Sequence, residues 1–178
     1  MKVRKVTLFT GRTLRVPTGI QRIDHGSTHG WQLRYGGTKL FSDGTQDGSG
    51  AVASLAAARA ELLKRIAKLP APARLQRSPN ENKTSALSVG ISGPVVRLRK
   101  GAKVRDCSFS VSLPRYGATP QRRSVYIGTE NTFSTERYNL ALAKAVELRA
   151  AAEMAYRSAA TRAKRAAARA LESKRKSG

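Results

Sequence analysis

Apolar and polar residues alternate with a period of two in two stretches of the chain. The first is WQLRY at 31–35, and the second is SFSVSL at 108–113. This period is typical of a β-strand whose side chains point in turn to opposite faces of a sheet. Each stretch therefore predicts a strand in a sheet with one buried face and one face in water. Trp31 and Phe109 begin the buried sets, and we expect both to pack against a helix rather than stack on bases.

A helical period follows each predicted strand region. In residues 55–69 an apolar stripe ends before two prolines, and in residues 142–156 a second stripe runs into an alanine-rich segment. The first stripe consists of Leu55, Leu62, Ile66 and Leu69, and the second of Leu142, Ala145, Leu148, Ala152 and Tyr156. Both stripes predict helices that pack on a sheet.

Polar residues before each stripe are candidates for the helix N-cap. Ser49 or Ser54 is expected to cap the first helix, and Ser134 or Thr135 the second. Glu136 then places a negative charge at the positive end of the second helix.

The two regions form an internal repeat. TGI at 18–20 and VGI at 89–91 each open a first strand, and TKLFS at 38–42 and SVYIG at 124–128 each form a third strand before the helix. The predicted fold class is α+β, with two repeats of a three-stranded antiparallel sheet packed on one helix and a basic C-terminal helical extension.

Composition divides the chain into five segments. The predicted segments are a basic N-terminal arm or hairpin around Gly11 (1–16), a first module (17–69), a Pro- and Ser-containing linker (70–87), a second module (88–150), and an Ala-, Arg- and Lys-rich tail that is either helical or disordered (151–178).

Charge indicates the class of partner. The 178 residues include 34 Lys and Arg against 11 Asp and Glu, for a formal net charge of +23. Such a charge attracts polyanions, so nucleic acid is the first partner to consider and an anionic membrane surface the second. No apolar run approaches the ~20 residues that cross a bilayer, and the N-terminus lacks a secretory signal. We expect a protein of the cytoplasm, in a bacterial nucleoid or phage-infected cell, or of the nucleus.

Few residues suit catalysis or metal binding. Cys107 is the only cysteine and is interpreted as structural or incidental. His25 and His29 are the only histidines, and the glycines beside them favour a turn over a metal site. We therefore expect no enzyme activity, no catalytic residue, no metal, no cofactor and no small-molecule ligand.

The alternation predicts which side chains face outward. The expected DNA-binding residues are Arg22, Gln32, Arg34 and Lys39 in the first module and Arg97, Arg99, Arg115, Arg122 and Tyr126 in the second. Phosphate contacts are expected from the tail residues Arg162, Lys164, Arg165 and Arg169. Arginine and glutamine can bond base edges in the major groove, whose width of about 12 Å admits a two-stranded ribbon. The alternative is an ordinary solvated face.

The segment VYIGTENTFSTERYNLALAKA, with GPVVRLRKG and SFSVSL before it, resembles the DNA-binding domains of the APETALA or ethylene-response-factor family. The resemblance covers residues 88–150 and, less closely, 17–69. It implies that a three-stranded sheet lies in the DNA major groove with the helix behind it. The chain departs from the family pattern at KLFSDGTQDGSG, where a Leu-Gly-Thr turn is expected, at Ser124, where a basic residue is expected, and at Phe109, where tryptophan is preferred.

Together these features predict a non-enzymatic double-stranded DNA-binding protein. It would be a transcription regulator or a nucleoid-associated protein that places two sheets in successive major grooves. Two alternatives remain, an RNA-binding protein of the ribosome-associated kind and the DNA-binding accessory of a recombinase or homing endonuclease.

Overall fold

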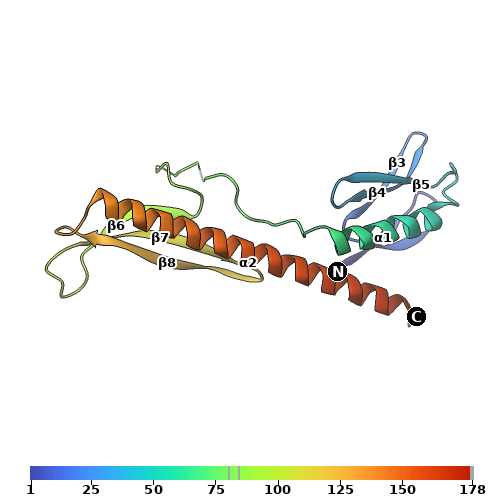
Figure 1. Ribbon diagram of the computed structural model, residues 1–178. Coiled ribbons are helices and arrows are strands. Elements are labelled where there is room, and N and C mark those ends of the chain that lie inside the picture. The colour runs from blue at the N-terminus through green and yellow to red at the C-terminus, as the bar shows by residue number, and fades with distance from the viewer. Residues whose placement is uncertain (80, 84, 177–178) are drawn as a thin grey trace. The chain divides into compact units, whose positions relative to one another are not determined.

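The computed structural model of the protein describes residues 1–79, 81–83 and 85–176 and confirms the α+β class (Figure 1). Asn80 and Thr84 of the predicted linker and the last two residues of the predicted tail lie outside the described residues. The described part holds one two-stranded and two three-stranded antiparallel sheets. Its elements are β1 (Val3–Thr7), β2 (Thr13–Pro17), β3 (Ile20–His25), β4 (Thr28–Arg34), β5 (Thr38–Ser42), α1 (Ala51–Lys68), β6 (Ile91–Arg97), β7 (Asp106–Arg115), β8 (Ala118–Thr129) and α2 (Thr135–Lys176).

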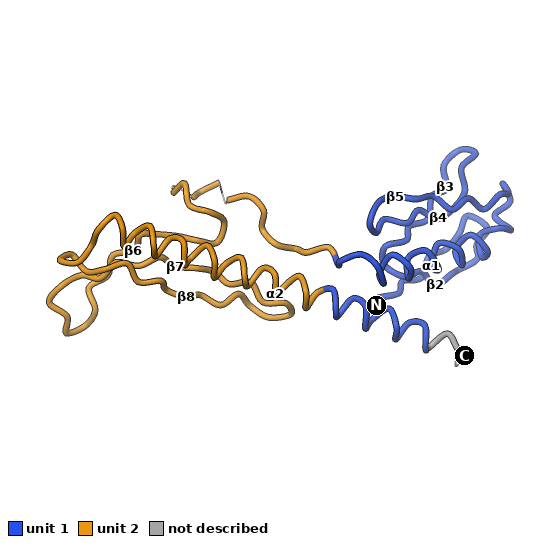
Figure 2. Tube along the Cα trace, viewed as in Figure 1, with its two compact units in different colours: residues 1–71, 161–178 blue, residues 72–160 orange. Residues whose placement is uncertain are grey.

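The chain divides into two compact units, coloured separately in Figure 2. Unit 1 consists of residues 1–71 together with 161–178, and unit 2 of residues 72–160. The second module and the start of the predicted tail thus belong to unit 2, whereas the end of the tail belongs to unit 1.

The N-terminal segment forms a hairpin, one of the two predicted alternatives. Strands β1 and β2 pair antiparallel, and Gly11 adopts a positive φ of 82° in the turn between them. That conformation is open to glycine because it has no Cβ. Val16 in β2 and Leu8 in the turn are buried in the core of unit 1.

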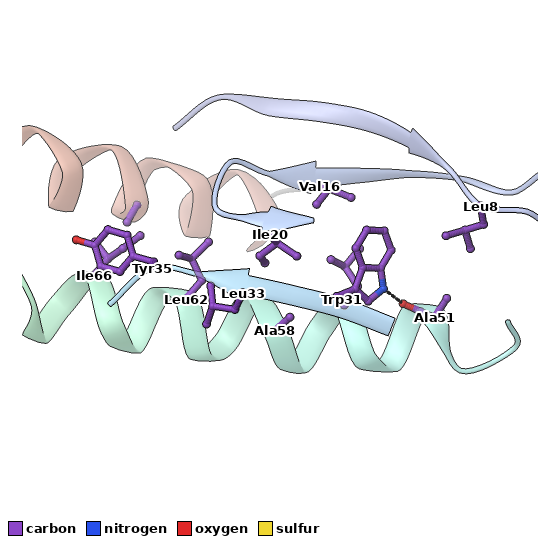
Figure 3. Packing of buried hydrophobic residues seen from close by; sticks show 12 residues of the cluster. Leu8, Val16, Ile20, Trp31, Leu33, Tyr35, Ala51, Ala58, Leu62 and Ile66 are labelled. Atoms are coloured by element: carbon purple, nitrogen blue, oxygen red, sulfur yellow. Dashed lines mark hydrogen bonds between the residues drawn. The ribbon is translucent and has the colours of Figure 1, made fainter. Parts of the chain in front are cut away.

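The first three-stranded sheet has the order β3-β4-β5 and carries α1 on one face. Trp31 is fully buried, and its Nε1 donates a 2.8 Å hydrogen bond to the carbonyl oxygen of Ala51 (Figure 3). Leu55, Leu62 and Ile66 of the predicted stripe are buried as well. The predicted packing of strand against helix is therefore confirmed.

The predicted serine cap of α1 is wrong. Gly50 is the N-cap and makes no side-chain hydrogen bond, while Ser54 lies within the first helical turn and donates to Asp43 Oδ1 at 2.6 Å. A Cβ on Gly50 would lie 1.8 Å from the carbonyl oxygen of Asp43. This close backbone approach favours glycine at the position where a capping serine was expected.

The second three-stranded sheet has the order β6-β7-β8 and packs on α2. Phe109 is fully buried, and its ring meets that of Tyr138 at a centroid distance of 5.1 Å. Its β7 and β8 strands are longer than their counterparts in the first sheet, and register shifts interrupt both ladders. The two sheets share an order and a direction of pairing but differ in length and regularity.

A glycine with a positive φ angle precedes the first strand of each three-stranded sheet. Gly19 and Gly90 have positive φ angles of 104° and 79°, and the isoleucine that follows each is buried. The carbonyl oxygen of Gly19 accepts a hydrogen bond from the Arg34 amide, and that of Gly90 accepts one from the Ser112 amide. The predicted turn into each first strand is confirmed.

Helix α2 begins at the predicted cap and continues through the predicted tail. The Arg137 amide donates a 3.2 Å hydrogen bond to Ser134 Oγ. Within unit 1, Thr161 Oγ1 accepts from the Ala71 amide and Ala168 is buried in the core. The tail is helical to Lys176, and its part in unit 1 packs against that unit. No helix in the described ranges combines the length and apolarity needed to cross a membrane.

Candidate nucleic-acid interface

The second sheet has an open face on the side away from α2, which we call the serine face. Ser108 lies opposite Tyr126, and Ser112 lies opposite Arg122, so these side chains share one side of the sheet. Its members are Ser92, Val95, Arg97, Asp106, Ser108, Ser110, Ser112, Arg122, Ser124 and Tyr126. Three of the predicted DNA-binding residues therefore lie on one face.

The chemistry of the serine face is polar and cationic. Arg97 and Arg122 are exposed and make no hydrogen bond or ion pair with any other described residue. Tyr126 is 53% exposed, which is high for an aromatic side chain in a sheet. Serines occupy the centre, and their short side chains leave the strand backbone close to whatever lies on the face.

The other two predicted residues of this sheet lie at its ends. Arg99 follows β6 and pairs with Asp106 at 2.6 Å, although its own side chain remains 75% exposed. Arg115 lies two residues after Leu113, which packs against the core, and it pairs with Ala118 at the end of the β7-β8 ladder beyond a register shift, so it does not belong to the serine face. Asp106 also supplies the only carboxylate among the serine-face residues.

Sequence alternation missed a basic loop between β6 and β7. Residues 98–105, LRKGAKVR, carry Lys100, Lys103 and Arg105 in addition to Arg99, and all four are exposed. Arg105 lies 3.4 Å from Glu130 with its side chain 65% exposed. The signal that could have found this loop is the run of positive charge itself.

The open face of the first sheet holds two of the four predicted residues. Gln32 and Arg34 lie on the side of β4 opposite Trp31 and Leu33, and Arg34 Nε donates to Gln32 Oε1. Leu40 lies opposite Gln32 and is 43% exposed. This face carries less free charge than the serine face.

The prediction that Arg22 lies on the open face is wrong. Arg22 stands directly opposite Trp31, with its guanidinium carbon 5.1 Å from the centre of the Trp31 ring. Its side chain is only 7% exposed and pairs with Asp24 at 2.7 Å and with Asp43 at 2.6 Å. β3 begins with buried Ile20, and side chains two positions apart in a strand point to the same face of the sheet. Arg22 therefore lies on the helix-facing side.

The prediction that Lys39 lies on the open face of the first sheet is also wrong. Lys39 stands opposite buried Leu33, which places it on the side of α1. Its ammonium group lies 5.1 Å from the centre of the Phe41 ring. A hydrogen bond from Arg65 is the main cause of the lowered pKa of Glu61, and the charge of Lys39 adds to it. Lys39 is exposed because β5 is an edge strand, not because it faces outward from the sheet.

Arg22, Asp24, His29 and Asp43 form a charged network beside the first core. Burial acts to lower the pKa of Arg22, but hydrogen bonds and charge from Asp43 and Asp24 outweigh it and raise that pKa above its usual value. Burial acts to raise the pKa of Asp24, whereas hydrogen bonds from Arg22 and His29 bring it below its usual value. The network stabilises charge within unit 1 and does not present it to a ligand.

The four predicted tail residues differ in their surroundings. Arg162 and Arg169 are exposed, and Arg165 is exposed while donating to the Ile66 carbonyl at 3.4 Å. Lys164 is half-buried, with its ammonium group 5.6 Å from the centre of the Tyr35 ring. Burial lowers the pKa of Lys164. Arg162 and Arg169 are the better placed for phosphate.

The described ranges contain no cluster of three or more His, Cys, Asp or Glu side chains that could hold a metal ion. Cys107 is buried, and burial raises the pKa of its thiol. Comparison with known proteins finds no matching family model, no matching curated protein and no matching solved structure.

Proposed function

We propose that the protein is a non-enzymatic double-stranded DNA-binding protein in which the serine face makes the principal contact. The observation that carries this proposal is the pair Arg97 and Arg122, exposed and unpaired among the described residues, on an open sheet face. The net charge of +23 supplies attraction to a polyanion. The resemblance of residues 88–150 to APETALA or ethylene-response-factor domains supports the same function.

The serine face has the chemistry that major-groove recognition requires. Arginine can donate two hydrogen bonds to a guanine edge, and a sheet ribbon fits a groove about 12 Å wide. The central serines are short enough for the strands to approach the bases. Arg99, Lys100, Lys103 and Arg105 in the neighbouring loop would contact phosphates, which position the protein without selecting sequence.

The first sheet supplies a second and weaker contact in this proposal. Its open face offers Arg34 and Gln32, and α2 adds Arg162 and Arg169 for phosphate. Such a protein would act as a transcription regulator or a nucleoid-associated protein, in the bacterial nucleoid or in the nucleus.

The test compares matched arginine substitutions in the full chain. Arg97→Ala with Arg122→Ala should weaken duplex DNA binding at least tenfold, because each base contact by arginine contributes about 1–3 kcal/mol. The control, Arg12→Ala with Arg74→Ala, removes the same charge from exposed positions outside both three-stranded sheets. This control should lose little affinity at moderate salt. Equal affinities of the two double variants, measured by fluorescence anisotropy, would refute the proposed face.

A further inference from the structure

A groove in unit 2 runs between β8 and the beginning of α2, and it borders the serine face at Ser124 and Tyr126. It has a volume of about 720 Å³. Residues that line it include Arg123, Val125, Arg137, Leu140, Lys144 and Leu148. We call it the β8 groove.

The β8 groove has an apolar floor. Val125 and Ala141 are buried beneath it, Leu148 is half-buried, and Leu140 is 65% exposed on α2. An exposed leucine beside buried apolar residues offers a contact for an apolar side chain. A nucleic-acid backbone has no comparable group to place there.

The rim of the β8 groove is basic. Arg123, Arg137 and Lys144 are exposed along it, and none of the lining residues is acidic. An occupant of this groove is therefore expected to carry negative charge together with apolar side chains.

One wall of the groove is a free strand edge. β8 pairs with β7 and stands at the end of the sheet order, so every second residue turns its backbone N–H and C=O groups away from β7. An extended peptide can pair with such an edge and gain main-chain hydrogen bonds. Side chains on one side of the added strand would then meet Leu140 on α2.

We propose that the β8 groove binds an acidic, extended segment of a partner protein, which adds to the sheet as a strand beside β8. Apolar side chains of the segment pack on Leu140 and Leu148, and its carboxylates pair with Arg137 and Lys144. A second copy of this chain is a poor occupant because Arg122 and Arg123 of each β8 would be brought together. This surface borders the proposed DNA contact at Ser124 and Tyr126, but the proposed peptide binding does not depend on DNA binding.

The test uses the full chain and a labelled peptide of roughly ten residues that alternates glutamate with valine or leucine. A second peptide with lysine in place of glutamate has the same period and the opposite charge. The acidic peptide should bind with a Kd below about 100 μM by fluorescence anisotropy, and the basic peptide should not bind. Amide hydrogen exchange should slow at residues 123–127. Failure of the acidic peptide to bind at about 1 mM overturns the proposal.

Matched variants locate the binding. Leu140→Asp and Lys144→Glu should each weaken binding of the acidic peptide at least tenfold. The controls Met154→Asp and Lys103→Glu should not weaken it. Met154 is 68% exposed and Leu140 65%, and Lys103 is an exposed lysine like Lys144. Equal losses in test and control variants would mean nonspecific attraction. A loss of duplex DNA binding in Lys144→Glu that exceeds the loss in Lys103→Glu would assign the groove to nucleic acid instead.

Discussion

At the residue scale, the position of a charged side chain in a strand does not by itself determine its role. Arg22 and Arg97 both lie in first strands, yet Arg22 is buried between two carboxylates and Arg97 is exposed and unpaired among the described residues. The difference depends on which face of the sheet the strand position points to and on carboxylates that are distant in sequence. Asp43 follows the third strand, so its partnership with Arg22 is not visible in the local pattern.

Removing Asp43 should destabilise unit 1. Asp43→Ala leaves Arg22 with one carboxylate and also removes the shortest of the hydrogen bonds that Ser54 Oγ donates. Loss of one partner from a buried ion pair costs about 3–5 kcal/mol of the free energy of unfolding. Trp31 is the only tryptophan and lies in the core of unit 1, so its fluorescence during urea unfolding reports this change. The double variant Arg22→Met, Asp43→Leu should restore part of the lost stability. An Asp43→Ala variant as stable as the parent would show that the charged network does not stabilise unit 1.

The lowered pKa of Asp24 predicts a pH dependence. A carboxyl group with a lowered pKa in the folded state contributes stability above its unfolded pKa of about 4, and this contribution is lost as pH falls through the folded value. Unit 1 should therefore lose stability in acid, partly through Asp24. Asp24→Asn should be less stable at pH 7 and should lose less stability between pH 7 and acid. Parallel pH profiles of the two proteins, from Trp31 fluorescence, would remove Asp24 as a contributor.

At the element scale, the sequence predicted the strands and the helix stripes well because both depend on local periodicity. TKLFS at 38–42 coincides with β5, and Trp31 in β4 and Phe109 in β7 are buried as predicted, although Cys107 precedes Phe109 in the buried set of β7. The cap of α1 was missed because the carbonyl oxygen of Asp43 lies too close to Gly50 for a side chain at that position. This is a tertiary contact that the local sequence does not show. The end of α2 was missed as a packed element because its alanines give no strong stripe.

The end of α2 should stabilise unit 1. Ala168 is 6% exposed in the core that also holds Leu62 and Ile66, so Ala168→Asp places an unpaired charge there. We expect a loss of about 2–4 kcal/mol in the free energy of unfolding of unit 1. Ala166→Asp makes the same change at an exposed position of the same helix and should cost about 1 kcal/mol or less. Similar losses in both variants, again followed by Trp31 fluorescence, would argue against packing by this segment.

At the scale of the whole molecule, charge and architecture support one account. Each unit covers its three-stranded sheet with a helix on one face and leaves the other face open. The two open faces differ, because Arg22 and Lys39 turn toward the helix side of the first sheet while Arg97 and Arg122 remain on the serine face of the second. The sequence predicted two three-stranded sheets, each packed on a helix, but it did not predict this difference between their open faces.

The charge of the chain predicts a steep dependence of binding on salt. Each phosphate neutralised on B-DNA contributes about −0.9 to the slope of log affinity against log salt concentration. Arg97→Ala with Arg122→Ala should reduce duplex affinity at every salt concentration. Substitution of loop lysines such as Lys100 and Lys103 should mainly make the slope shallower.

The most direct test measures binding of the full chain to duplex DNA, single-stranded DNA and duplex RNA of equal length across a salt series. The account predicts that duplex DNA binds most tightly and that this preference persists at about 200 mM salt. It also predicts that the preference falls in the Arg97→Ala, Arg122→Ala variant. Binding to duplex RNA as tight as or tighter than binding to duplex DNA would contradict the account and favour an RNA-binding protein.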